Sequence, residues 1–144
     1  MENSINLSIL IPIIPFGVTV FITALLSLFN RTVNRLTKPI SLLLLISFIF
    51  SILLSAYFLI NHIEGQIYLS SYLPIFENSK LQIHINEITE KFILLLELIS
   101  SILIIYSLAK LPRQKGYVLY LVNIGFFTSL IISGLLLYDI NLIN

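Results

Sequence analysis

Four long apolar stretches alternate with shorter polar segments along the chain. They cover residues 7–29, 40–60, 92–109 and 117–138. Three of them contain no charged residue, and the third in order contains one, Glu97. Each is close to the roughly 20 residues that an α-helix needs to cross the hydrocarbon core of a bilayer. The pattern therefore predicts four membrane-spanning helices.

The apolar stretches are continuous, whereas transmembrane β-strands alternate between apolar and polar positions. In lipid, every backbone group must find its partner within the protein, which favours helices despite the many β-branched isoleucines. We expect an all-α integral membrane protein. Because the chain shows neither an internal repeat nor a low-complexity linker, residues 1–144 are predicted to form a single membrane domain.

The segment between the second and third apolar stretches is about 30 residues long, which is unusual for a connection without structure of its own. It contains 66–73, then Pro74 and a polar group, and then 81–86, where apolar and polar residues alternate. Alternation with a period of two is typical of a half-buried strand. We therefore expect a β-hairpin in this loop, lying on the membrane surface.

Composition supports a lipid-facing surface and excludes several classes of function. Only 10% of the residues are charged and the mean hydropathy is +1.02, whereas soluble domains carry charge on about a quarter of their residues. A net charge of +1 gives no electrostatic basis for nucleic-acid binding. The chain has no cysteine, its two histidines are far apart, and no phosphate-binding loop or Ser/His/Asp set is present. We predict no catalytic, cofactor-binding or metal site, and no catalysis by the chain alone.

The positions of the basic residues predict the orientation in the membrane. Six of the eight occur in the two loops that a four-helix topology places on the same side: Arg31, Arg35, Lys38, Lys110, Arg113 and Lys115. The positive-inside rule places these loops in the cytoplasm, or in the stroma of a thylakoid. The hairpin and both termini are then outside or lumenal. The predicted location is a bacterial plasma membrane or a thylakoid membrane, spanned several times.

Small residues recur at every fourth position in three of the predicted helices. The sets are Thr19, Thr23 and Ser27; Ser47, Ser51 and Ser55; and Gly125, Ser129 and Ser133. This spacing keeps each set near one helix face, and small side chains let helix backbones approach closely. We interpret the sets as packing faces, within the chain or against a partner. A polar pathway for ions or water is the alternative.

Glu97 is the one charged residue well inside a predicted helix, and it shares a helix face with Glu90 and Ser101. An intramembrane carboxyl group is energetically costly and points to function by default. The structural alternative is a hydrated or subunit-facing position near the helix start. Both interpretations remain open because the sequence identifies no partner cation.

Taken in order, several segments resemble the N-terminal part of the antiporter-like chain 5 subunit of NADH-quinone oxidoreductase, in particular the large F subunit of the cyanobacterial and chloroplast complex. They are the Leu-Ile-Pro-x-x-Pro segment 10–15, the hairpin segment 68–86, Ile105–Leu108, Gly125–Phe127 and Ser133–Asp139. The loop at 110–116 and Thr128 depart from the family pattern. The resemblance implies a place in the membrane arm of a respiratory or photosynthetic complex, with sister membrane subunits as partners.

The resemblance also implies a proton channel built from a glutamate of the fifth helix and lysines of later helices, and residues 1–144 contain no counterpart of these. The function hypothesis is therefore a membrane-arm component of a proton-translocating NAD(P)H-quinone oxidoreductase that is not catalytic alone. The first alternative is a small stand-alone oligomeric transporter or channel that uses Glu97. The second is a membrane assembly factor. The transported ion and the quinone type are not specified by the sequence.

Overall fold

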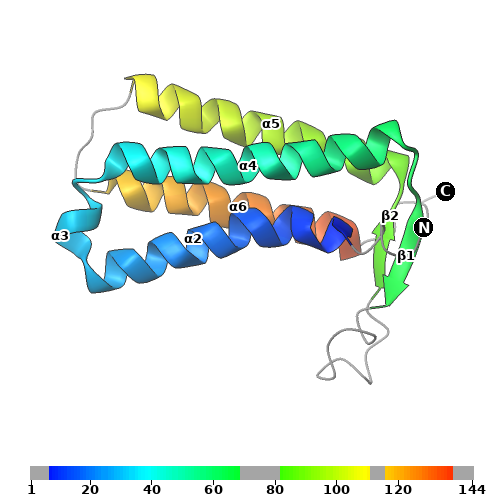
Figure 1. Ribbon diagram of the computed structural model, residues 1–144, viewed down its shortest axis with the longest axis horizontal. Coiled ribbons are helices and arrows are strands. Elements are labelled where there is room, and N and C mark those ends of the chain that lie inside the picture. Colours follow the sequence, from blue (N-terminus) through cyan, green and yellow to red (C-terminus); the bar gives the residue numbers. More distant parts are fainter. Residues whose placement is uncertain (1–6, 69–81, 111–115, 138–144) are drawn as a thin grey trace.

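The computed structural model describes residues 7–68, 82–110 and 116–137. Four long helices lie side by side: α2 (Leu10–Leu28), α4 (Thr37–Ile60), α5 (Glu87–Lys110) and α6 (Tyr117–Leu137). A 3₁₀ turn, η1 (Leu7–Ile9), precedes α2, and a short helix, α3 (Asn30–Val33), joins α2 to α4. Successive long helices run in opposite directions (Figure 1). The predicted all-helical fold class is confirmed.

The predicted hairpin is also present. It pairs β1 (Gly65–Tyr68) with β2 (Gln82–Ile85) in antiparallel register, with Gly65 opposite Ile85 and Tyr68 opposite Gln82. The hairpin lies at the end of the bundle where α4 ends and α5 begins, and α3 lies at the opposite end (Figure 1). Ile83 and Ile85 of β2 are buried against the helices.

Two helices begin earlier than their apolar stretches. The side chain of Asn86 accepts a hydrogen bond from the backbone N–H of Thr89 at 2.7 Å, a typical N-cap interaction, so α5 begins at Glu87. The start of α4 at Thr37 places Pro39 in its first turn, where a missing N–H costs no helical hydrogen bond. The described helices therefore include polar residues that hydropathy alone leaves in the loops.

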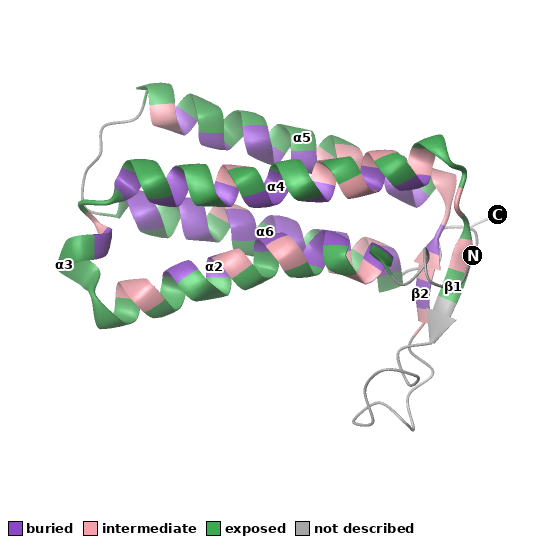
Figure 2. Cartoon of the chain, viewed as in Figure 1, coloured by how far each residue is buried: buried purple, intermediate pink, exposed green. Residues whose placement is uncertain are grey.

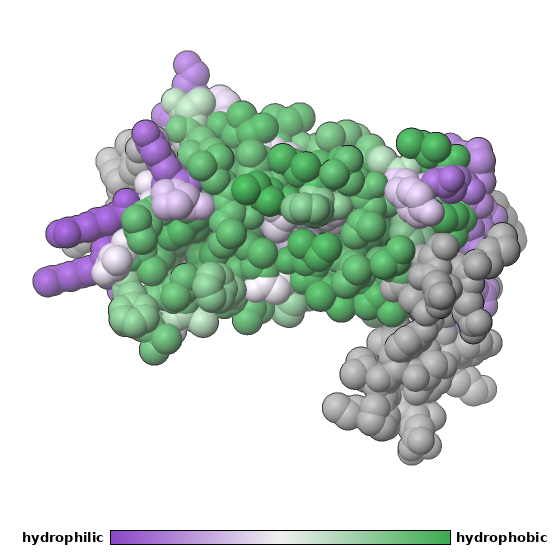
Figure 3. All heavy atoms as spheres, viewed as in Figure 1, coloured by the Kyte–Doolittle hydropathy of each residue, from purple (hydrophilic) through white to green (hydrophobic). Residues whose placement is uncertain are grey.

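The four long helices pack as a bundle in which α4 contacts α2 and α5, and α6 contacts the same two helices. Buried residues line the inside of the bundle, and the outward faces are exposed (Figure 2). These outward faces are apolar along the helices, with polar residues at the two ends (Figure 3). All four helices are long and apolar enough to cross a membrane. This distribution is that of a membrane protein, whose lipid-facing surface need not be polar.

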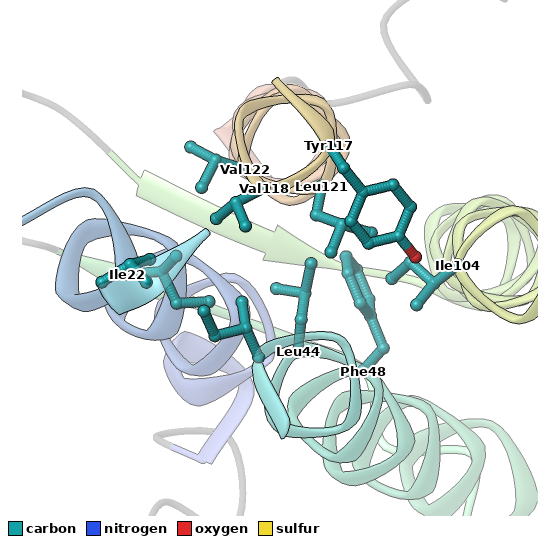
Figure 4. Close-up of a cluster of buried hydrophobic side chains, with 10 residues drawn as sticks. Ile22, Leu44, Phe48, Ile104, Tyr117, Val118, Leu121 and Val122 are labelled. Atoms are coloured by element: carbon teal, nitrogen blue, oxygen red, sulfur yellow. The ribbon is translucent and has the colours of Figure 1, made fainter. Parts of the chain in front are cut away.

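The apolar core has two parts. One lies toward α3 and brings Ile22, Leu44, Phe48, Ile104 and Leu121 together from all four long helices (Figure 4). The other lies at the hairpin end, where all four long helices and β2 contribute buried side chains.

Buried small and polar residues lie between these two clusters, and we call them the central polar layer. Its members are Thr19, Ser51, Ser55, Glu97, Ser100, Ser101, Thr128 and Ser129.

Candidate functional site

Glu97 of α5 lies in the central polar layer with none of its surface exposed. Two serines of α4, one helical turn apart, bind its carboxyl group. The Ser51 hydroxyl contacts Oε1, and the Ser55 hydroxyl donates to Oε2 across 3.1 Å. Both carboxyl oxygens therefore have partners on one neighbouring helix, and the contact joins α4 to α5 in the middle of the bundle.

Ser51 has a second contact, with the backbone of α2. Its hydroxyl oxygen lies 2.7 Å from the carbonyl oxygen of Ile11. In a regular helix this carbonyl accepts from the backbone N–H four residues later, but residue 15 is proline and has none. Pro15 thus leaves an acceptor unused inside the bundle, and Ser51 supplies the missing donor. The three helices α2, α4 and α5 meet at this one hydroxyl group.

Glu90 is the second buried carboxyl group of α5. It lies two turns before Glu97 and is 1% exposed, and among the described residues neither of its carboxyl oxygens has a hydrogen-bond partner. Glu87, one turn earlier, behaves differently: it is exposed and forms a 2.6 Å ion pair with Lys91. Ser101, the third residue of the predicted Glu97 face, is buried too, and its hydroxyl is unpartnered. Because the third apolar stretch starts at residue 92, the sequence places Glu90 in the predicted outer loop. The spacing between Glu90 and Glu97 nevertheless indicates that the two residues share a helix face.

Further polar contacts join α5 to α6. The hydroxyl groups of Ser100 and Thr128 lie 2.8 Å apart in the buried interior. Nearer to α3, the hydroxyl of Tyr117 points toward α5 (Figure 4) and lies 3.0 Å from that of Ser107 and 3.4 Å from that of Ser41. The hydropathy and small-residue patterns of the sequence do not single out these contacts. The seven-residue spacing of Ser100 and Ser107 is the one signal that places both on a common face of α5.

The three sets of small residues occupy different positions. On α4, Ser47, Ser51 and Ser55 are all buried. On α6, Gly125 and Ser129 face the interior, and Ser133 is half-buried.

On α2 only Thr19 is buried. Thr23 and Ser27 are exposed on the outside of the bundle, where each hydroxyl donates to a carbonyl of its own helix.

The basic residues that are predicted to determine the topology lie, where the structure describes them, at one end of the bundle. Arg31, Arg35, Lys38 and Lys110 are all exposed at the α3 end. Arg113 and Lys115 lie outside the described residues. The hairpin end carries Glu64, Glu87 and Lys91. The described basic residues of the two predicted inner loops therefore lie at the end of the bundle opposite the hairpin, as the predicted orientation requires. The side of the membrane that each end faces stays a prediction.

The described residues contain no group of three or more His, Cys, Asp or Glu side chains that could hold a metal ion. The chemistry that the arrangement offers is that of two buried carboxyl groups and a set of hydroxyls. Such groups can bind and release protons, and they can join helices by hydrogen bonds.

The comparison with family models finds none that matches this chain. Among curated proteins, NAD(P)H-quinone oxidoreductase subunit 5 of the organellar chromatophore of Paulinella chromatophora is similar, with 28% identity over 140 residues. The alignment covers 94% of this chain but 21% of that protein. The two proteins are distantly related. The chain spans about a fifth of the length of this relative, and its similarity extends over nearly all four helices and the hairpin.

Proposed function

We propose that the protein is a membrane-arm component of a proton-translocating NAD(P)H-quinone oxidoreductase and is not catalytic alone. One observation carries the proposal: the similarity to subunit 5 is not limited to one helix, but covers 94% of a chain with four spanning helices and a hairpin. Two apolar helices can resemble each other by composition alone. A similarity that extends through the hairpin and the polar connections is harder to explain in that way.

The exposed surface supports a role among other membrane subunits. Within an 18-residue window of each spanning helix, 28 to 39% is buried inside the chain. The remaining apolar surface is available to lipid or to neighbouring helices. Thr23 and Ser27 lie on this outer surface, and small polar residues are enriched where membrane helices contact each other. We expect sister subunits of a respiratory or photosynthetic complex to contact α2 at these positions.

The proposal can be tested in the membranes in which the protein naturally occurs. Tagged protein, solubilised in mild detergent, is expected to migrate on native gels in a large complex with NAD(P)H dehydrogenase activity. The other subunits should appear in stoichiometric amounts by mass spectrometry. Migration of the chain by itself, with the dehydrogenase activity elsewhere on the gel, contradicts the proposal.

The alternatives differ in what they require of Glu97. A stand-alone oligomeric transporter with its pathway between subunits needs the carboxyl group on the outer surface, whereas Glu97 has no exposed surface and its two oxygens contact serines of the same chain. This burial favours the first proposal. Ion flux through liposomes containing only this chain, lost on Glu97→Gln, would support the transporter instead. A membrane assembly factor is distinguished by substoichiometric amounts in the mature complex.

A further inference from the structure

Hydrogen-bond donors can be counted at the contact between α2, α4 and α5. The Ser51 hydroxyl carries one hydrogen but lies within hydrogen-bond distance of two groups, the carbonyl of Ile11 and the carboxyl of Glu97. A carbonyl oxygen can only accept, and an ionised carboxylate can only accept as well. With an ionised Glu97, one of the two contacts of Ser51 would lack a hydrogen.

Both contacts are satisfied when Glu97 is a neutral carboxylic acid. Ser51 then donates its hydrogen to Ile11, Oε1 of Glu97 donates its own hydrogen to Ser51, and Ser55 donates to Oε2. Every hydroxyl hydrogen in this arrangement has one acceptor. The carbonyl left unused by Pro15 is also paired, which matters because unpaired backbone groups in lipid are costly.

Glu90 provides a second, independent observation. It is 1% exposed, and its carboxyl group has no hydrogen-bond partner among the described residues. Burying an ionised carboxylate without a partner is energetically costly, whereas a neutral acid avoids most of that cost. Glu90 and Glu97 lie about 10 Å apart along the axis of α5, given a rise of 1.5 Å per residue. They are too far apart to share one proton.

Within the described residues, the elements around the two carboxyl groups supply no positive charge to them. η1, α2 and α6 contain no charged residue, and Lys38 of α4 is exposed at the far end. On α5 itself, Lys91 pairs with Glu87 at the surface and Lys110 ends the helix. In the hairpin region His62 and Glu64 are exposed, and His84 alternates along β2 with the buried Ile83 and Ile85.

We propose that Glu97 and Glu90 form a proton-binding site inside the bundle, in which each carboxyl group holds one proton in the resting protein. The proton of Glu97 lies in the hydrogen bond from its carboxyl group to the Ser51 hydroxyl. Glu90 holds a second proton near the hairpin end of the bundle. The site binds protons and not a metal cation. Cations such as Ca²⁺ need six or more oxygen ligands, whereas the described residues give the carboxyl oxygens of Glu90 no hydrogen-bond partner. The site belongs to this chain and does not depend on a place in a larger complex.

Infrared spectroscopy of the full chain in lipid vesicles tests the proposal. A protonated carboxylic acid has a C=O stretching band that a carboxylate lacks, and isotopic labelling of glutamate separates it from lipid esters and the single aspartate. At neutral pH the wild type is expected to show this band from two groups. Glu97→Gln and Glu90→Gln should each remove part of it, and the double variant should remove it all. Glu87→Gln is the matched control and should leave it unchanged, because Glu87 is exposed and paired with Lys91.

Three results would overturn the proposal. The first is absence of the band from labelled wild-type protein at neutral pH, a result that does not depend on whether any variant folds. The second is a band that survives in the double variant. The third is loss of the band when Na⁺ is raised at constant pH, which would show a cation site in place of a proton site.

Discussion

Gly125 of α6 packs directly against Thr19 of α2. A Cβ atom at Gly125 would lie 2.2 Å from Cγ2 of Thr19, well inside van der Waals contact. The missing side chain of Gly125 therefore determines how closely α2 and α6 pack. Close packing at small residues is a main source of helix association in lipid, where burial of apolar surface contributes little.

Gly125→Ala is expected to destabilise the bundle by roughly 1–3 kcal/mol, the usual cost of overpacking. Gly134→Ala on the same helix is the matched control, because nothing lies within 4 Å of its Cβ position, and we expect little change or a small gain. Unfolding in mixed detergent micelles, followed by circular dichroism, measures both. Thr19→Ser removes Cγ2 but keeps the hydroxyl, so it should recover part of the loss. Equal effects of the two glycine substitutions would contradict the assignment.

Ser51→Ala should cost about 1–3 kcal/mol, because it leaves the carbonyl of Ile11 and one oxygen of Glu97 without a partner in the interior. Ser27→Ala is the control, since Ser27 is exposed and bonds only to its own helix. Pro15→Ala supplies a backbone N–H at residue 15, which can donate to the carbonyl of Ile11. The cost of Ser51→Ala should therefore fall in a Pro15→Ala background, and strict additivity of the two substitutions would refute this role of Ser51.

The Ser100 and Thr128 hydroxyls should show a coupling energy of about 0.6 kcal/mol, the average for hydrogen bonds between membrane helices. A double-mutant cycle with Ser100→Ala and Thr128→Val measures it. Ser101→Ala combined with Thr128→Val should be additive, because the Ser101 hydroxyl has no hydrogen-bond partner. Additivity in both cycles would show that the 2.8 Å contact adds nothing to stability.

The orientation can be tested by cysteine labelling without any background, since the chain contains no cysteine. Asn30→Cys at the basic end and Gln66→Cys in the hairpin both replace exposed residues. In intact cells or right-side-out vesicles, an impermeant maleimide should label position 66 and not position 30. After permeabilisation both should react. The reverse pattern would overturn the orientation predicted from the basic loops.

Thr23→Leu combined with Ser27→Leu should weaken the association with partner subunits but leave the fold intact, because both side chains lie outside the bundle. Native gels of solubilised membranes report the association, and circular dichroism reports the fold. Phe21→Leu, on a different exposed face of α2, is the control. If the complex retains the double variant, the partner does not contact this face.

The four helices and the hairpin could be predicted from the sequence because they depend on local properties. These are the length of each apolar stretch, which must match the membrane, and the alternation of apolar and polar residues in the hairpin. It did not predict the first residue of α5, because the side chain of Asn86 determines that boundary by capping. Glu90 consequently remained in the predicted loop. The face shared by Glu90, Glu97 and Ser101 follows from helical periodicity and is buried as a unit.

The partners of Glu97 could not be predicted in the same way. Periodicity places Ser51 and Ser55 on one face of α4, but it does not say which helix that face meets. The contact with Ile11 involves a backbone atom, which no side-chain pattern indicates. On α2, each four-residue step rotates by about 40° relative to the starting face. One such step already places Thr23 outside the interior that contains Thr19, and the second step carries Ser27 further from it.

The contact at Ser51 also limits how the helices can slide. Contacts between isoleucine and leucine side chains have no directional requirement, so they constrain the height of one helix against another less than a hydrogen bond does. Movement of α2 or α5 alone along α4 would separate Ser51 from Ile11 or from Glu97. Because one hydroxyl group holds both contacts, α2 and α5 meet α4 at the same height, and their apolar surfaces pack around this common point.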